Sequence, residues 1–218
     1  MAHLPGGPVG RTLSPKDLRP NLVLHGGGMT GVVAIHPATR ERWRDLETLF
    51  GQHGAYGGCW CMWWRLTRSE FNRNAGEGNR LALKALVDSG LVPGLVAYAD
   101  GQPIAWCSVG PRETFPALER SRTLKRVDHQ PVWSIVCFFI AKPFRRQGLM
   151  AELLAAAVRY AADNGAGIVE GYPVEPKESG LRNYEGYTGV VSAYRRAGFV
   201  EVLRRSQDQP IMRCVVRQ

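Results

Sequence analysis

The stretch Ile140-Ala-Lys-Pro-Phe-Arg-Arg-Gln-Gly-Leu-Met150 decides the fold, because a buried strand, a loop rich in hydrogen-bond donors and a long helix meet there. Residues 132–140 form a near-continuous apolar run, which is typical of a strand that is buried on both faces. Residues 148–163 carry apolar side chains at helical spacing, and Asn164-Gly165 ends the helix. A buried strand followed at once by a helix predicts an α/β layer with a parallel crossover.

The loop of this stretch has the chemistry of an anion site. The first turn of a helix leaves backbone N–H groups unpaired and carries the positive end of the helix dipole. Gly148 lets an anion approach the backbone closely, and Arg145 and Arg146 add positive charge. The same residues also fit an ordinary strand-to-helix turn with solvated arginines, so the loop taken alone leaves both interpretations open.

The patterns before the buried strand predict two helices and a hairpin. Residues 32–35 form a short strand pattern, and Pro37 suits the first position of a helix. The buried stripe of this helix consists of Trp43, Leu46, Leu49 and Phe50. Thr67 and Glu70 have capping-box spacing for a further helix. Asp100-Gly101, between two β-rich runs, predicts the hairpin.

After the helix at 148–163 the chain returns to the sheet. Residues 168–174 predict a strand, 188–197 a helix, and 199–204 with 211–216 a closing pair of strands. The predicted order is β-α-α-β-β-β-α-β-α-β-β. This order describes an α/β fold with a mixed, mostly antiparallel sheet flanked by helices.

Composition narrows the class of protein. The chain has 218 residues with a formal net charge of +9, and it is 44% hydrophobic, as expected of a globular protein. The positive charge indicates an anionic partner such as nucleic acid, a membrane surface or a phosphorylated cofactor. Five cysteines, an odd number, favour reduced thiols over a disulfide framework. No apolar run has the ~18 residues of a membrane span and no signal-peptide pattern opens the chain, so we expect a cytoplasmic protein without a membrane partner.

The first residues differ from the rest. Residues 1–28 are rich in glycine and proline and predict a flexible tail in front of a single domain at 29–218. Met29 is a candidate for the true start or for the domain boundary, and the intact mass of the native product distinguishes a chain with the tail from one without it.

Two motifs resemble one known family. The loop fits the pattern (Gln/Arg)-x-x-Gly-x-(Gly/Ala) of the acetyl-CoA-binding motif in the GNAT N-acetyltransferase superfamily, with matches at Arg145 and Gly148 and a departure at Met150. Downstream, Ala193-Tyr-Arg-Arg-Ala-Gly-Phe199 resembles the helix-to-strand signature of the same family. By element order the resemblance covers residues 30–217, and the two specific motifs span 140–151 and 193–199.

The resemblance implies acetyl-CoA as acetyl donor and direct attack by a primary amine in a ternary complex. It places acetyl-CoA between the 132–140 and 168–174 strands, and it also allows a homodimer. The implied donor-binding residues are Phe138, Ile140, Arg145, Arg146, Gln147, Gly148, Leu149, Met150 and Ala151. Tyr194 is the implied proton donor to the departing thiolate, while an amphipathic helix would also pack a tyrosine there.

The general base has several candidates. Glu170 comes first, because strand alternation places it inside an apolar run, where burial raises the pKa of a carboxylate. Glu175 comes second, and Asp128 with His129 third. Each also fits a solvated or hydrogen-bonded structural position, and a water chain to bulk solvent is a further option.

An aromatic segment, Gly57-Gly-Cys-Trp-Cys-Met-Trp-Trp-Arg65, precedes these motifs. By the resemblance this region covers the acceptor pocket, and Trp63 and Trp64 there would suit a small aromatic or apolar amine. Core packing and a zinc site built on the two cysteines are the alternatives, but no second cysteine pair follows, so we expect no metal. Cys137, on the buried strand, fits a small core residue.

The connection at 175–187 is long for a strand-to-helix loop, and we expect Tyr184, with Arg182 and Tyr187, to close over the acceptor. Two rival functions stay open. One is an acyl-CoA sensor without turnover. The other is a basic nucleic-acid-binding module, although no nucleic-acid motif appears and the phosphates of CoA account for the basic charge as well.

Overall fold

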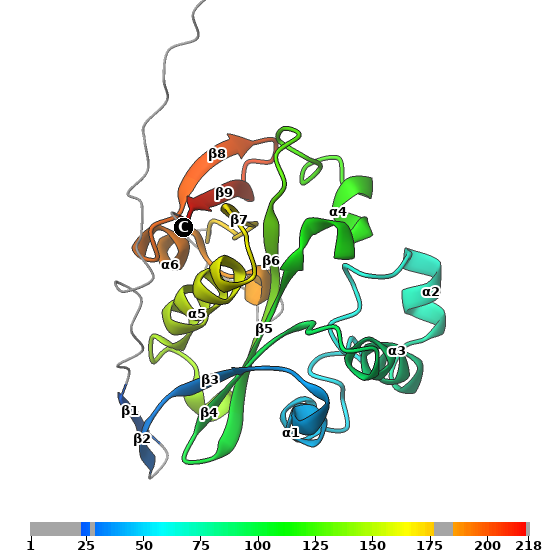
Figure 1. The fold of residues 1–218 in the computed structure, drawn as a ribbon, viewed down its shortest axis with the longest axis vertical. Helices are drawn as coiled ribbons and strands as arrows, with labels where there is room; N and C mark the ends of the chain where they lie inside the picture. The colour runs from blue at the N-terminus through cyan, green and yellow to red at the C-terminus, as the bar shows by residue number, and fades with distance from the viewer. Residues whose placement is uncertain (1–22, 27–28, 177–184, 217–218) are drawn as a thin grey trace, which may run out of the picture.

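A seven-stranded sheet forms the centre of the protein (Figure 1), and the structure, a computed structural model, describes residues 23–26, 29–176 and 185–216. The strand order in the sheet is β3-β4-β5-β6-β7-β9-β8. Only β6 and β7 pair in parallel, and the other neighbouring pairs are antiparallel. Its strands are β3 (Ala34–Pro37), β4 (Gly94–Ala99), β5 (Gln102–Pro111), β6 (Trp133–Ile140), β7 (Ile168–Gly171), β8 (Val200–Arg204) and β9 (Pro210–Val215). The predicted fold class is therefore confirmed.

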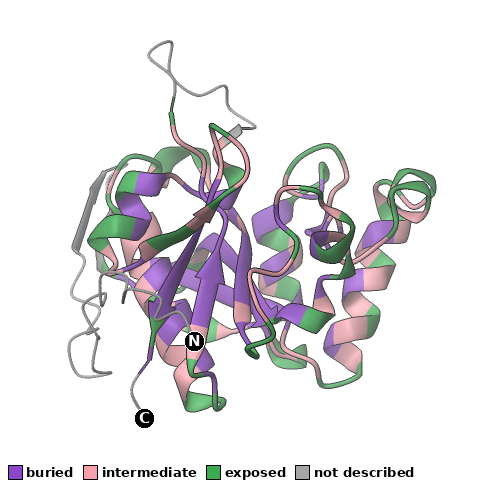
Figure 2. Cartoon of the chain, turned by 90° about the horizontal axis from the view of Figure 1, so that it is seen from above, coloured by how far each residue is buried: buried purple, intermediate pink, exposed green. Residues whose placement is uncertain are grey.

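Helices cover both faces of the sheet, and the strands between them are buried (Figures 1 and 2). One face carries α5 (Leu149–Asp163) and α6 (Val191–Arg196). The other carries α1 (Trp43–Phe50), α2 (Arg68–Arg73), α3 (Glu77–Asp88) and α4 (Pro116–Arg120). None of the helices in the described ranges combines the length and apolar character needed to cross a membrane.

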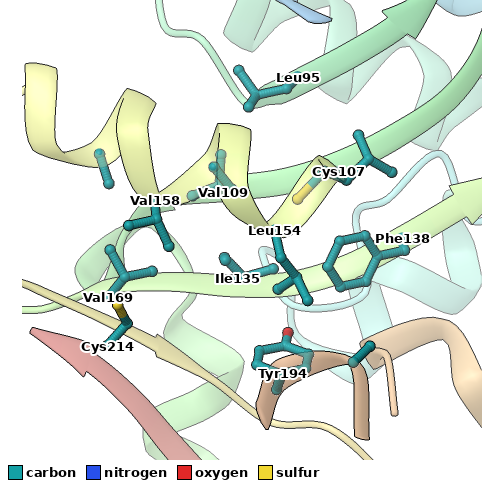
Figure 3. Packing of buried hydrophobic residues seen from close by; sticks show 14 of the residues in the cluster. Leu95, Cys107, Val109, Ile135, Phe138, Leu154, Val158, Val169, Tyr194 and Cys214 are labelled. Carbon is teal, nitrogen blue, oxygen red and sulfur yellow. The ribbon is translucent and has the colours of Figure 1, made fainter. Parts of the chain in front are cut away.

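The alternation of side chains along β4 divides the core into two clusters. Leu95 and Ala97 pack with α5 and α6, whereas Val96 and Tyr98 pack with α1 and α3. The first cluster is drawn in Figure 3, which labels Phe138 of β6, Leu154 of α5 and Tyr194 of α6. The two clusters lie on opposite faces of the sheet.

Several local predictions are confirmed. The four residues of the predicted stripe on α1 are all buried. The Thr67 hydroxyl accepts a hydrogen bond from the backbone N–H of Glu70, and the Glu70 carboxylate accepts one from the backbone N–H of Thr67. Asp100 and Gly101 both have positive φ, at 48° and 75°, as a tight hairpin turn requires.

One prediction near the N-terminus is wrong. Pro37 ends the edge strand β3, where it lies opposite Leu95, and α1 begins only at Trp43. An edge strand tolerates proline because one side of its ladder needs no donor. The predicted tail contains part of a two-stranded ribbon, β1 (Val23–Gly26) with β2 (Met29–Val32). Residues 1–22 of that tail lie outside the described residues.

The sheet opens between β6 and β7. Their register runs only from Trp133 to Ile135, and β7 ends at Gly171, earlier than the predicted 174. At the same point β6 has a bulge, since Ile135 and Cys137 lie opposite consecutive residues of β5. Beyond Ile135 no described strand pairs with this edge of β6. The predicted helix at 188–197 is also shorter, because it begins at Val191, after a 3-10 turn (Glu185–Thr188).

Candidate functional site

A cavity of about 830 Å³ lies at this opening in the sheet. Its wall includes Phe138 and Val190, which belong to the cluster on the α5 face. It also includes Cys61, Trp106 and Cys137, which belong to the clusters on the α1 face. The cavity therefore joins the two faces of the sheet through the gap that β7 leaves beside β6.

One end of the cavity is cationic. Three guanidinium groups, from Arg145, Arg146 and Arg196, belong to its wall together with Gly148, the N-cap of α5. Arg146 and Gly148 have positive φ values of 63° and 82°. No side chain caps the helix, so no capping group would compete with an anion at its N-terminus. The amide of Ala151 donates to the Gly148 carbonyl at 2.9 Å.

Most of the predicted donor-binding residues line this cavity. They are Phe138, Ile140, Arg145, Arg146, Gly148, Leu149, Met150 and Ala151. Gln147 does not belong to the wall, because its side chain turns back and donates to the Pro143 carbonyl at 2.9 Å. The Ile140 carbonyl already accepts a hydrogen bond from Arg145 Nε at 2.9 Å.

Tyr194 lies beneath the cavity wall and is fully buried. Its ring packs edge-on against Phe138 (Figure 3) and against Phe199. Its hydroxyl donates to the Thr188 carbonyl at 3.1 Å. A Cβ atom at Gly171 would stand 2.1 Å from the ring, so the end of β7 has room for the tyrosine only because this residue is glycine. Burial raises the pKa of Tyr194 well above its ordinary value.

Glu170 does not reach the cavity wall but lies in a buried ion network. Its Oε1 accepts hydrogen bonds from Arg112 Nη1 at 2.9 Å and from the Tyr172 hydroxyl at 2.7 Å. Its Oε2 accepts one from Arg213 Nε at 2.8 Å. Both oxygens are occupied by these partners, so the structure places the first predicted base in a structural network.

The other predicted bases also lie apart from the cavity. Glu175 pairs with Arg204 at 2.8 Å on the surface. Asp128 pairs with Arg213 at 2.6 Å, and this bond is the main reason that the pKa of Asp128 lies below its usual value. His129 is exposed. None of the three belongs to the described wall of the cavity.

The two tryptophans predicted to bind the acceptor lie in different surroundings, one at the cavity wall and one in the core. Trp63 lines the cavity, where its ring meets Phe71 edge-on at 5.0 Å and lies under the guanidinium of Arg68. Trp64 is buried in a separate cluster with α4 and does not belong to the described wall of the cavity. Tyr184, the third predicted acceptor residue, lies outside the described residues.

Three thiols also belong to the wall, although the sequence predicted none of them as a donor- or acceptor-binding residue. Cys59, Cys61 and Cys137 all line the cavity, and Cys137 is only half-buried rather than a core residue. Sequence offers a weak signal for them, since Cys59 and Cys61 are close neighbours but Cys137 lies on a distant strand. Among the described residues no group of three histidine, cysteine or acidic side chains could hold a metal ion.

The sequence model of the acetyltransferase (GNAT) family matches residues 60–199, which is more than half of the chain. No curated protein matches the sequence.

Solved structures share the fold at low sequence identity. A GNAT-family acetyltransferase from Listeria monocytogenes is 9% identical with a TM-score of 0.53, over 88% of this chain and 99% of that one. An N-acetyltransferase from Staphylococcus aureus is 11% identical with a TM-score of 0.51, over 85% of this chain and 99% of that one. The family match includes most of the cavity wall and the loop before α5, and with it we conclude that the chain belongs to the GNAT acetyltransferase family.

Proposed function

We propose that the protein transfers an acetyl group from acetyl-CoA to a primary amine by direct attack in a ternary complex. The observation that carries this proposal is the cavity itself, which connects a cationic helix terminus on one face of the sheet with an apolar chamber on the other. A donor with phosphates at one end and a thioester at the other matches this division of charge.

The residues present fit the donor. The first-turn amides of α5 with Arg145, Arg146 and Arg196 would hold the pyrophosphate, because amides and guanidinium groups together bind anions strongly. The unpaired edge of β6 would offer backbone groups of Phe138 and Ile140 to the amide-containing arm of the donor. Arg145 Nε would then have to release the Ile140 carbonyl.

For the proton that the leaving thiolate needs, we retain Tyr194 as the candidate. Its ring fills the notch at the end of β7, so its hydroxyl lies near the point where the sheet opens. The raised pKa keeps the phenol protonated at neutral pH, as a proton donor must be. Tyr187, an exposed residue on the cavity wall, is a second phenol.

We further propose that the acceptor is a small amine with an aromatic or apolar body. The chamber beyond the opening contains Phe50, Trp63, Phe71 and Trp106. Aromatic side chains of this kind bind flat apolar groups through area burial and edge-to-face contacts. No carboxylate is present in the described wall to recognise a second cationic group.

The test is calorimetric titration of acetyl-CoA into wild type and Gly148→Glu. The new carboxylate would stand where the pyrophosphate binds, so we expect affinity to fall by about 100-fold or more, which corresponds to about 2.7 kcal/mol. Gly167→Glu is the matched control, because a Cβ there meets open space without positive φ. Equal affinity of wild type and a folded Gly148→Glu would refute the assigned phosphate site, and no binding to wild type would refute the proposed donor.

A further inference from the structure

Arg68 is held against the outside of the cavity wall by an aromatic ring. Its guanidinium lies over the ring of Trp63, at 4.4 Å from the centroid. Trp63 belongs to the wall and meets Phe71, a second wall residue, edge-on at 5.0 Å. Arg68 and Phe71 are three residues apart on α2, so they share one face of this helix. Arg68 does not itself line the cavity, but it is only one ring away from it.

The stacked guanidinium keeps its hydrogen-bond donors available for a ligand. A guanidinium that lies on an aromatic ring uses its flat face, whereas its five N–H groups point outward in the plane. Arg68 is exposed, and its side chain makes no ion pair or hydrogen bond to any residue that the structure describes. Two neighbouring arginines differ, since Arg120 donates to the Leu66 carbonyl and Arg65 donates to two carbonyls.

The aromatic chamber has an inner end at the sheet and an outer end at α2. Trp106 of β5 and Cys137 of β6 line the inner end, and they belong to neighbouring strands. Trp106 is fully buried, whereas Trp63 and Phe71 at the outer end are only half-buried. Helix α2 lies away from the sheet (Figure 1). A molecule that fills the chamber therefore extends from β6 toward the ring that carries Arg68.

The chemistry of the proposed transfer fixes which end of the acceptor faces inward. The donor would lie along the unpaired edge of β6, so the amine of the acceptor must reach the inner end of the chamber. The far end of an aromatic acceptor would then come to rest between Trp63 and the solvent, beside Arg68. A planar guanidinium with free donors binds a carboxylate through two parallel hydrogen bonds.

The charges of the cavity favour an anionic group at that place. The charged side chains of the described wall are three arginines, and they lie at the donor end. A carboxylate on the acceptor would thus meet the positive charge of Arg68 without competition from an acidic side chain of the described wall. The phosphates of the donor would occupy the arginines at the other end.

We propose that the acceptor is an aromatic amine with a carboxylate at the end of its ring opposite the amine, and that Arg68 selects it. This inference rests on the proposed acetyl transfer and narrows the class of acceptor given above. Arg68 touches neither the amine nor the thioester in this arrangement. It determines specificity by binding and orienting the acceptor, so its effect should fall on KM more than on kcat.

The first experiment compares the acetylation of 4-(aminomethyl)benzoate with that of 4-(aminomethyl)benzamide. The two probes share ring and amine and differ in the charge at the far end. We expect wild type to prefer the carboxylate by about tenfold in kcat/KM, which corresponds to about 1.4 kcal/mol. A much larger preference is not expected, because solvent screens an exposed ion pair. The homologous 4-(2-aminoethyl) pair tests a deeper chamber, and equal use of carboxylate and carboxamide in both pairs would overturn the inference.

Variants of α2 assign the preference to one side chain. Arg68→Gln should lower kcat/KM for the carboxylate about tenfold and leave that for the carboxamide unchanged. Arg68→Lys should keep part of the preference, because it retains the charge but not the planar fork. Arg73→Gln is the matched control, since Arg73 is an exposed arginine of the same helix, five residues further along and on another face. A preference that persists in Arg68→Gln, or that Arg73→Gln abolishes equally, would overturn the assignment.

Salt distinguishes recognition of charge from recognition of shape. The Debye length falls from about 10 Å at 0.1 M to about 3 Å at 1 M ionic strength, so the preference for the carboxylate should decrease over this range. The kcat/KM of the carboxamide should change much less. A preference that is independent of salt would contradict an ion pair with Arg68.

Calorimetry separates this inference from the proposed function. A wild type that binds no acetyl-CoA would refute the proposed donor. Titration of 4-(aminomethyl)benzoate and its carboxamide into the free protein would then still decide whether Arg68 binds a carboxylate, since it needs no turnover. Equal affinity for the two probes, together with intact binding of acetyl-CoA, would overturn the inference and leave the proposed transfer standing.

Discussion

Replacing Glu170 by glutamine tests whether this carboxylate stabilises the fold or removes a proton. The residue is 1% exposed and accepts three hydrogen bonds, two of them from guanidinium groups. Removing one partner of a buried ion pair costs about 3–5 kcal/mol, because the remaining charge stays buried without compensation. Arg112 keeps Glu119 and Arg213 keeps Asp128, so we expect the lower end, about 3 kcal/mol.

Urea unfolding of Glu170→Gln measures this loss. At an m-value of about 3 kcal/mol/M, the midpoint should fall by about 1 M. The melting temperature should fall by about 6–12 °C, at 2–4 °C for each kcal/mol in a chain of this size. Glu175→Gln is the matched control, because its partner Arg204 is at the surface, where an ion pair contributes about 0–1 kcal/mol.

The kcat of Glu170→Gln distinguishes a stabilising role of this carboxylate from a role as the general base. Where Glu170 only stabilises the fold, kcat of the folded variant should stay within about twofold of wild type, whereas loss of a base lowers it by about 10²–10⁴. Wild-type stability in Glu170→Gln would refute the energetic reasoning about the buried network. Native stability combined with a hundredfold loss of kcat would restore Glu170 as the base.

Two other substitutions probe the wall of the cavity. Gly171→Ala places a Cβ 2.1 Å from the Tyr194 ring, and overpacking of this kind should lower the free energy of unfolding by about 1–3 kcal/mol in urea titrations, whereas Gly167→Ala meets open space and should change it little. Trp63→Ala should raise KM for aromatic amines relative to aliphatic ones in an acceptor screen, because Trp63 lines the cavity. Trp64→Ala should instead lower stability by about 3–5 kcal/mol and leave the acceptor preference unchanged, since Trp64 lies in the core. A shift of preference in Trp64→Ala, or none in Trp63→Ala, would contradict the assignment of the two rings.

The parts of the fold that sequence predicted are those set by short-range chemistry. The strand, loop and helix around Gly148 follow one another within a few residues, and so do the Thr67–Glu70 box and the Asp100-Gly101 turn. Each depends on hydrogen bonds or φ values that neighbouring residues determine. The loop before α5 was therefore predictable from the sequence as a helix terminus with cationic neighbours.

The surroundings of the candidate catalytic side chains were not predictable in this way, because their partners come from distant segments. Glu170 reads as a base on its own strand, but Arg112 and Arg213 lie 58 and 43 residues away along the chain. In the cavity wall, Cys61 and Trp106 are likewise 45 residues apart. No periodicity relates such residues, and only the folded sheet brings them together.

The aromatic segment at 57–65 shows a second reason why the surroundings of side chains were not predictable from the sequence. Left-handed turns at Trp60 and Cys61 interrupt both the helical and the strand repeat. The direction of the next side chains then cannot be counted from a regular pattern, and the adjacent Trp63 and Trp64 end in different surroundings. Pro37 is a similar case, since it is compatible with a helix start and with an edge strand alike.

Exposed residues border the cavity at two places, the arginines before α5 and the pair Tyr56 and Gly57. Under the proposed acetyl transfer, donor and acceptor that enter at these two places would not obstruct each other. We then expect that either can be the first to bind, and that the acetylated product can depart while CoA is still held. The same arrangement lets an unreacted amine occupy its chamber beside spent CoA, so high amine concentrations should slow turnover as CoA accumulates.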